Sequence, residues 1–387
     1  MRRGWQTKTL GNLCQLISGQ HIDAKDYNTD SRGVGYLTGP SDFGLLNPII
    51  SKWTEHPKIK AKRGDVLITV KGSGVGKINL LDEEEVAISR QLMAVRVTGA
   101  DPRFVHAILS STFDHFQSLS TGAAIPGISR EQVLGLPIAL PPLAEQQRII
   151  GLLDEAFAGI ATAKTNAEKN LQNARALFES HLQSVFSERG DGWKQKTLKE
   201  IATTFGRGRS KHRPRNEPKL YGGKYPFVQT GDIRNADHFI TAFSQTYSEA
   251  GLAQSKLWPK GTICITIAAN IAETAILDFD ACFPDSVIGV VANPKEADVG
   301  FIEYLLQSFK ARIQAMGKGS AQANINMGTF ENERFPFPTV AEQKQIVTRL
   351  DSLSKETQRL TSLYERKLVA LEALKKSLLH QAFTGEL

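Results

Sequence analysis

The glycine-rich segment Lys71-Gly-Ser-Gly-Val-Gly-Lys77 has the look of a phosphate-binding loop. A P-loop requires glycine five positions before Gly76, where Lys71 stands, and serine or threonine after Lys77, where Ile78 stands. We therefore interpret the segment as a turn between two strands. In a DNA-binding protein its lysines and exposed backbone amides would still suit phosphate groups.

Other catalytic signatures are missing from the sequence. It has no Asn/Asp-Pro-Pro-Tyr/Phe motif of amino-methyltransferases, no Gly-x-Ser-x-Gly and no HExxH. The Glu-x-Lys sequences that follow Pro284-Asp285, at Glu342 and Glu365, fall within a predicted helix, which argues against a metal-dependent nuclease site. Neither the histidines nor the cysteines have the spacing of metal ligands. We predict no catalytic residue, no metal site and no cofactor in this chain.

Basic residues are the strongest candidates for a binding site. The stretch from Arg207 to Lys224 is rich in Arg and Lys, is opposed only by Glu217, and contains prolines and glycines that predict a loop. Such a loop suits a phosphate backbone or a guanine edge; a solvated charged loop is the open alternative. The predicted DNA-binding residues are Arg32, Lys71, Arg90, Arg207, Arg209, Lys211, Arg213, Arg215, Lys224 and Arg234.

The composition fits an acidic partner. The net charge is +7 and the pI is about 9.2, an excess that favours nucleic acid without proving it. No run of 18 apolar residues predicts a membrane span, and no apolar stretch follows Met1-Arg2-Arg3 to make a signal peptide. We expect a cytoplasmic protein whose cysteines are reduced and buried.

The chain repeats itself, and the elements that position these residues must therefore occur twice. Residues 5–10 and 193–198 match 188 positions apart, whereas Ala-Glu-Gln recurs at residues 144–146 and 341–343, 197 positions apart. The second half has thus gained 197 − 188 = 9 residues, mostly in the basic run after Gly206 by our interpretation. We predict a duplicated module: a domain at 1–142, a long helix at 143–188, a second domain at 189–338 and a second helix at 339–387.

Each predicted domain mixes strands and helices. The short β-branched runs Val66–Val70 and Ile263–Ile267 each follow a glycine and predict strands. Apolar residues recur at helical spacing in 102–119 and 299–316. We expect an α+β domain with a twisted, partly closed sheet.

Both helical segments carry coiled-coil-like apolar stripes. The second helix begins with a capping box, Thr339 and Glu342, and the first begins at Pro142. Mutual antiparallel pairing is the simplest way to bury both stripes, and folding back of each helix onto its own domain is the alternative. Helix pairing or partner docking is assigned to Glu145, Gln146, Ile150, Leu153, Phe157, Leu171, Phe178, Glu342, Gln343, Ile346, Leu350, Leu353, Leu360, Leu371, Leu374 and Leu378.

The duplicated layout of the sequence resembles the specificity subunits of type I restriction–modification systems. Residues 138–149 and 335–346, each containing Ala-Glu-Gln, look like that family's boundary between a recognition domain and its helix. The Trp5 and Trp193 starts, the pairs Gly122…Ile128 and Gly319…Ile325, and the C-terminal residues 381–387 also fit. The resemblance covers nearly the whole chain.

The resemblance implies two target-recognition domains separated by two antiparallel helices, related by a pseudo-twofold repeat. Each domain would read one half of a bipartite double-stranded DNA site. Two methyltransferase subunits and two restriction or translocase subunits would join the chain, and S-adenosylmethionine, ATP and magnesium would bind in those partners. The runner-up is a scaffolding protein with two protein-binding domains on a helical rod, which salt-dependent DNA binding would distinguish. A DNA-modifying enzyme with an unfamiliar site is a third candidate, which methyl transfer by the isolated chain would favour.

Overall fold

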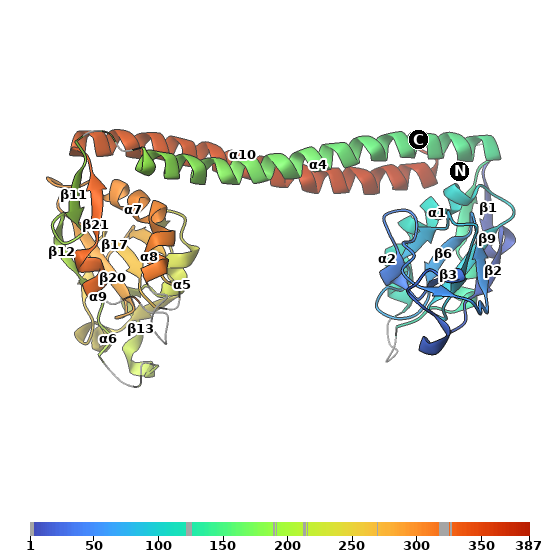
Figure 1. Cartoon of the computed structure of the whole chain (residues 1–387), viewed down its shortest axis with the longest axis horizontal. Coiled ribbons are helices and arrows are strands. Elements are labelled where there is room, and N and C mark those ends of the chain that lie inside the picture. The colour runs from blue at the N-terminus through green and yellow to red at the C-terminus, as the bar shows by residue number, and fades with distance from the viewer. Residues whose placement is uncertain are drawn as a thin grey trace. The chain divides into compact units, whose positions relative to one another are not determined.

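The computed structural model describes residues 4–120, 126–188, 190, 192–211, 214, 216–268, 270–316, 325 and 327–387. The chain forms two compact units, the first from residues 1–168 and 365–387 and the second from residues 169–364. Each unit contains one mixed domain and parts of two long helices, α4 (Leu143–Ser187) and α10 (Val340–Thr384) (Figure 1). We call the part before α4 the first domain and the part between α4 and α10 the second domain.

The first domain contains two four-stranded sheets and a separate strand pair. The sheet orders are β2-β9-β6-β7 and β4-β3-β8-β5, and β1 pairs with β10. The strands are β1 Gln6–Thr9, β2 Cys14–Ser18, β3 Val34–Leu37, β4 Trp53–Thr54, β5 Lys60–Lys62, β6 Val66–Thr69, β7 Ile78–Leu80, β8 Glu85–Ile88, β9 Leu92–Val97 and β10 Pro137–Leu140. The helices are α1 Pro102–Ser111, α2 Phe113–Leu119 and α3 Arg130–Leu134, with short 3-10 turns η1 Leu10–Asn12, η2 Ala24–Asp26 and η3 Pro40–Asp42.

The second domain repeats this plan. Its sheet orders are β12-β20-β17-β18-β14 and β15-β13-β19-β16, and β11 pairs with β21. The strands are β11 Lys194–Thr197, β12 Ala202–Arg207, β13 Tyr221–Phe227, β14 Phe239–Ile240, β15 Gln245–Tyr247, β16 Leu257–Trp258, β17 Ile263–Thr266, β18 Thr274–Leu277, β19 Ala281–Cys282, β20 Val287–Ala292 and β21 Arg334–Phe337. The helices are α5 Thr230–Asn235, α6 Glu249–Ala253, α7 Val299–Ser308, α8 Lys310–Met316 and α9 Met327–Asn332, with a 3-10 turn η4 Pro218–Leu220.

The structure confirms the α+β class, the repeat and the predicted elements. The two β-branched runs form β6 and β17, and the two helical stretches form α1–α2 and α7–α8. The glycine-rich segment is a turn between β6 and β7, with positive φ at Gly72 and Gly76. The strands of each domain form two separate sheets, whereas we expected one partly closed sheet, because alternation along a strand does not reveal its neighbours.

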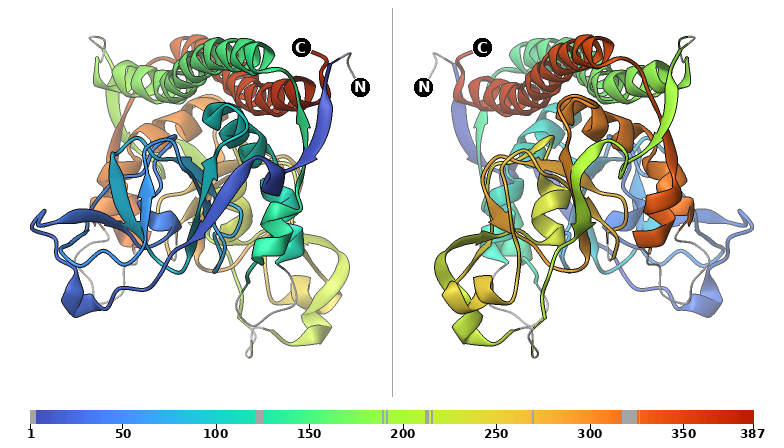
Figure 2. Two further views of the ribbon diagram at one scale, coloured as in Figure 1. Left: turned by 90° about the vertical axis from the view of Figure 1, so that its right-hand side faces the viewer. Right: turned by 90° about the vertical axis from the view of Figure 1, so that its left-hand side faces the viewer.

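The long helices α4 and α10 pack together in antiparallel fashion, as predicted. In the first unit the Arg148 side chain, at the start of α4, donates to the Leu387 carbonyl oxygen at 3.1 Å. About four turns further along α4, Lys164 forms an ion pair of 2.7 Å with Glu372. Since the first partner rises in number while the second falls, the two helices run in opposite directions (Figure 2).

Burial follows the predicted stripe, with one correction. Leu374 is 47% exposed and lies outside the seam, whereas Leu368, Leu371 and Leu378 on the same helix are half-buried. A turn of 3.6 residues allows a step of three or four, and the chain takes four after Leu371, so that Lys375 lies 5.2 Å over the Phe157 ring. Of the other predicted stripe residues, Ile150, Leu153 and Leu350 are buried and Phe157, Leu171, Phe178, Ile346, Leu353, Leu360, Leu371 and Leu378 are half-buried.

Within its own unit each domain also packs against the C-terminal end of the long helix that follows the other domain. Phe104 of α1 contacts Phe383 of α10 with ring centroids 5.7 Å apart, in an edge-on arrangement. Phe301 of α7 contacts Phe186 of α4 at 5.4 Å. The offset of 197 relates Phe104 to Phe301 and Phe186 to Phe383, so that the repeat preserves this contact while exchanging the helices.

His106 lies between α1 and the long helices of the first unit, where Arg103, Asp154 and Lys375 line the same cavity. Burial, with a smaller contribution from Arg103, lowers the pKa of His106 to about 4. Because this pKa is below the unfolded value of about 6.5, the neutral imidazole favours folding above pH 6.5, and this contribution disappears as the pH falls toward 4.

We predict that acidification from about pH 6.5 to about pH 4 removes roughly 2 kcal/mol of stability from the first unit through His106. His106→Gln should flatten this part of the pH dependence, since glutamine stays neutral. Hydrogen exchange of α1 amides measures the effect locally. His115→Gln, at an exposed position of α2, is the matched control. An equal acid response in wild type and His106→Gln would contradict the assignment.

Candidate nucleic-acid interface

In both domains the chain leaves an edge strand, β2 or β12, at a glycine that admits no side chain. A Cβ at Gly208, after β12, would overlap the carbonyl oxygens of Phe283 and Pro284. A Cβ at Gly19, after β2, would overlap the carbonyl oxygen of Ser89 in the same way. The two loops that follow therefore start from equivalent places, beside the turns β19–β20 and β8–β9. We call each of these places the strand-end surface of its domain.

The strand-end surface of the second domain contains a polar hollow of about 290 Å³. The amide Nε2 of Gln229, which follows β13, donates to Oε1 of Gln245 in β15 at 2.8 Å. Both side chains line the hollow, where Gln229 Oε1 is a hydrogen-bond acceptor and Gln245 Nε2 is a donor. The lining consists of Ser210, Asn216, Tyr221, Phe227, Gln229, Thr230, Gln245, Pro284 and Ser286.

Basic side chains lie around this hollow. Arg207 donates from Nε to the Asp285 carbonyl oxygen at 2.7 Å, which holds it beside the β19–β20 turn. Arg209 and Lys211 are exposed on either side of the lining residue Ser210. Lys256, which sequence reasoning missed, lies 3.6 Å over the Trp258 ring, and burial followed by the charge of Arg209 lowers its pKa. The positive charge of Arg209 thus raises the free-energy cost of protonating Lys256, and a bound anion would offset this cost.

Other parts of the predicted basic run are neutralised. Lys224 forms a 3.2 Å ion pair with Glu249 of α6 and lies over the Tyr225 ring, and Lys219 lies 3.7 Å from Glu217. Sequence reasoning counted only Glu217 as an opposing charge, because Glu249 is distant along the chain. Arg234 is exposed on α5. The predicted residues Arg213 and Arg215 lie outside the described residues.

The first domain has three predicted DNA-binding residues, and the fold brings two of them, Lys71 and Arg90, together. The Val70 backbone N–H donates to the Gln91 carbonyl oxygen at 2.8 Å, which sets Lys71 next to Arg90 at the strand-end surface. Lys52 adds a third positive charge, with its Nζ 3.3 Å from the Thr38 hydroxyl. Arg32 precedes β3 whereas Thr38 follows it, so the strand holds Arg32 at the other end, 3.6 Å from Asp30.

The predicted docking residues near the helix starts contact their own unit. Glu145 forms an ion pair with Arg148 at 2.8 Å, and Glu342 accepts a hydrogen bond from the Trp193 indole at 3.1 Å. Gln146 and Gln343, 2% and 0% exposed, bond to the adjoining domain. The Thr339 half of the predicted capping box is present, since its hydroxyl accepts from the Glu342 N–H at 3.3 Å.

Neither a metal cluster nor a membrane helix is found in the parts that the structure describes. No group of three or more His, Cys, Asp or Glu there is placed to hold a metal ion. No described helix has the length and apolar content needed to cross a bilayer. In the described chain Cys264 and Cys282 are buried thiols and Cys14 is half-buried.

Comparison with known proteins matches both halves to one family. The family model for the type I restriction modification DNA specificity domain matches residues 2–172 and 190–367. The MjaVIII specificity subunit of Methanocaldococcus jannaschii is 23% identical, over 99% of this chain and 93% of that protein. The EcoKI specificity subunit of Escherichia coli is 24% identical, over 73% of this chain and 64% of its own length.

Solved structures share the fold at low sequence identity. The HsdS subunit from Thermoanaerobacter tengcongensis matches with a TM-score of 0.72 and 19% identity, over 100% of this chain and 98% of that one. A chain from a study of assembly and conformational transition in the type I R-M system matches with a TM-score of 0.79 and 19% identity, over 100% and 99%. Because the family model covers both repeats, the chain belongs to the type I restriction–modification DNA specificity family, as the subunit that confers sequence specificity.

Proposed function

We propose that each domain reads one half of a bipartite DNA target through its strand-end surface. The observation that carries this proposal is the recurrence of a basic surface at the same place in the repeat. Lys71 and Arg90 supply the charge in the first domain, and Arg207 and Arg209 supply it in the second. Guanidinium and ammonium groups contact phosphates whatever the sequence, which positions a domain on the duplex.

Sequence discrimination in the second domain is assigned to the carboxamides of the hollow. Gln229 Oε1 and Gln245 Nε2 supply an acceptor and a donor, the complement of the adenine N6 amine and N7 in the major groove. Their mutual hydrogen bond of 2.8 Å fixes one rotamer of each side chain before DNA arrives, which lowers the entropy cost of binding. Arg209 beside them suits a guanine edge.

The assembly proposed for this subunit has two methyltransferase subunits and two restriction or translocase subunits. S-adenosylmethionine, ATP and magnesium belong to those partners, and this chain supplies recognition alone. A complex of this kind works on DNA in the cytoplasm. The exposed faces of α4 and α10, which carry many charged residues, are the surfaces on which we expect the partners to dock.

The direct test is the salt dependence of duplex binding by a double variant, Arg209→Ala with Lys211→Ala. Each lost phosphate contact should lower the slope of log affinity against log salt by about 0.9, giving a loss of roughly 2 for the pair. Binding titrations from about 0.05 M to about 0.2 M salt measure that slope. Adding Arg213→Ala extends the series along the same loop.

Lys219→Ala with Lys224→Ala is the matched control, because acidic neighbours already balance both lysines. It removes the same formal charge and should change the slope less. An unchanged slope in the Arg209 and Lys211 variant would show that the loop is a solvated surface and would remove the second domain's basic surface from the proposal.

A further inference from the structure

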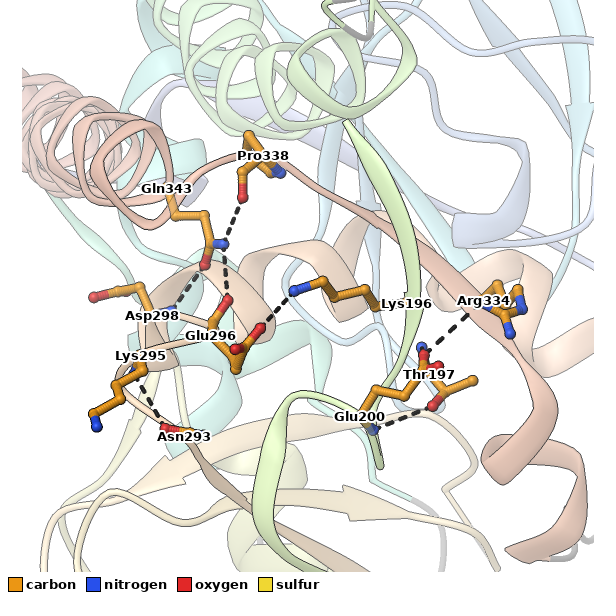
Figure 3. A network of polar contacts seen from close by, with 10 residues as sticks. All are labelled: Lys196, Thr197, Glu200, Asn293, Lys295, Glu296, Asp298, Arg334, Pro338 and Gln343. Carbon is orange, nitrogen blue, oxygen red and sulfur yellow. Dashed lines mark hydrogen bonds and ion pairs between the residues drawn. The ribbon is translucent and has the colours of Figure 1, made fainter. Parts of the chain in front are cut away.

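The glutamine of each Ala-Glu-Gln repeat is buried where a domain joins its long helix. In the second unit Gln343 Oε1 accepts from the Asp298 backbone N–H at 2.8 Å, and its Nε2 donates to the Pro338 carbonyl oxygen at 2.9 Å. A longer contact of 3.4 Å reaches the Glu296 carbonyl oxygen. Figure 3 shows this amide between the end of β21 and the loop before α7.

The first unit contains the same arrangement. Gln146 Oε1 accepts from the Asp101 N–H at 2.8 Å, and its Nε2 donates to the Pro141 carbonyl oxygen at 2.8 Å. Gln146 is 2% exposed, and Pro141 is buried like Pro338. Each glutamine holds three segments together, and we call this arrangement the joint. The segments are the end of the last strand of the domain (β10 or β21), the N-cap of helix α1 or α7, and the start of α4 or α10.

In the joint, the glutamine accepts the backbone N–H of the N-cap residue of α1 or α7. Asp101 and Asp298 are N-caps whose carboxylates accept backbone N–H groups of the first turn, at 2.8 Å from Arg103 and 3.1 Å from Phe301. In a capping box, the residue three positions later bonds back to the N-cap N–H. Here that position is Phe104 or Phe301, so the glutamine of the other helix supplies the missing acceptor.

Two bonds to rigid backbone in different directions restrict rotation of the domain about the helix start. A single amide therefore joins an N-cap, a strand end and a helix, and it cannot keep both bonds if the domain tilts. An ion pair stabilises the joint in the second unit. Lys196 of β11 contacts Glu296, in the loop before α7, at 2.6 Å (Figure 3).

We propose that Gln146 and Gln343 are positioning residues for DNA recognition, each fixing the angle between its domain and its helix and so the spacing of half-sites that the subunit accepts. This inference rests on the proposed bipartite reading. The glutamines need not touch DNA, and neither half-site sequence depends on them.

The test is selection of duplexes with a randomised core by the purified full chain, followed by sequencing of the bound fraction. Wild type is expected to select two half-sites at one spacing. Gln146→Met and Gln343→Met keep the side-chain length and remove both hydrogen bonds, so each should select the same half-sites over several spacings. Non-native spacings should rise roughly tenfold relative to wild type, which corresponds to about 1.4 kcal/mol of lost preference for the native spacing.

Gln146→Glu and Gln343→Glu supply a rescue that a merely structural role would not produce. A glutamate still accepts from the aspartate N–H, but only its protonated form donates to the proline carbonyl. Selection should therefore be narrow in spacing at about pH 5 and broad at about pH 8, relative to wild type at each pH.

Gln147→Met and Gln345→Met are the matched controls, because both residues are exposed one or two positions away. A single spacing in both methionine variants would overturn the proposal, and so would the selection of a different half-site sequence. If the methionine variants select nothing, spacing that is independent of pH in the glutamate variants overturns it. A wild type that selects no bipartite site would instead refute the proposed function.

Discussion

Asp65→Ala is expected to lower the stability of the first unit by about 3–5 kcal/mol, because it leaves a partly buried guanidinium without its counter-ion. The Asp65 side chain is 3% exposed and accepts two hydrogen bonds from Arg96, at 3.0 Å from Nε and 2.8 Å from Nη2. It also accepts the Lys62 backbone N–H at 2.8 Å. Urea unfolding together with hydrogen exchange of β6 and β9 amides would measure the loss.

The repeat provides a control for this pair. The second domain carries Thr262, just before β17, and Val291, in β20, at the equivalent positions. The double variant Asp65→Thr with Arg96→Val copies that solution, so it should recover most of the lost stability. Glu84→Ala removes an exposed acid and should change stability by less than about 0.5 kcal/mol. A cost below about 1 kcal/mol for Asp65→Ala would mean that the pair contributes little.

Phe301→Ala is expected to destabilise the second unit by about 3–5 kcal/mol through the cavity that it leaves. Phe301 is 0% exposed and its ring lies 5.4 Å from Phe186, 6.0 Å from Trp193 and 5.7 Å from Phe337. These rings come from α4, the segment after it and β21, so the truncation loosens three elements together. Urea unfolding followed by Trp193 fluorescence would detect it.

Phe239→Ala is the matched control, since this ring is 47% exposed in the same unit and should cost much less. Phe104→Ala tests the first unit, where Phe383 is the one ring within stacking distance among the described aromatic contacts. If Phe301→Ala unfolds at the wild-type urea concentration, the aromatic cluster is not what holds α4 to the second domain.

The sequence allowed prediction of the elements more readily than of their neighbours. Local spacing of residues in the sequence was enough to predict the repeat, the two long helices, and strands β6 and β17. Leu374 was assigned to the seam because it falls on the three-and-four spacing, yet it is 47% exposed, and the neighbouring Lys375 is the residue that reaches the Phe157 ring. The order of strands in two sheets depends on long-range pairing that alternation does not encode.

The candidate site shows the same limit. Lys224 was predicted to bind DNA because its local sequence is basic, but Glu249 reaches it from α6. Gln229 and Gln245 escaped notice because neither is unusual until folding joins them at 2.8 Å. The Ala-Glu-Gln repeat did mark Gln146 and Gln343 as important, although their role in the joint required the positions of Asp101 and Asp298.

The central claim, that this chain determines which DNA sequence its complex modifies, is tested most directly by a methylation map. The chain would be expressed with its methyltransferase partner in a host without other adenine methylation, and the genome read by single-molecule sequencing. We predict methylated adenines in one bipartite motif with an unread spacer, present only when this chain is expressed. Methylation at the same sites without the chain, or a motif with a single continuous recognition sequence, would contradict the account.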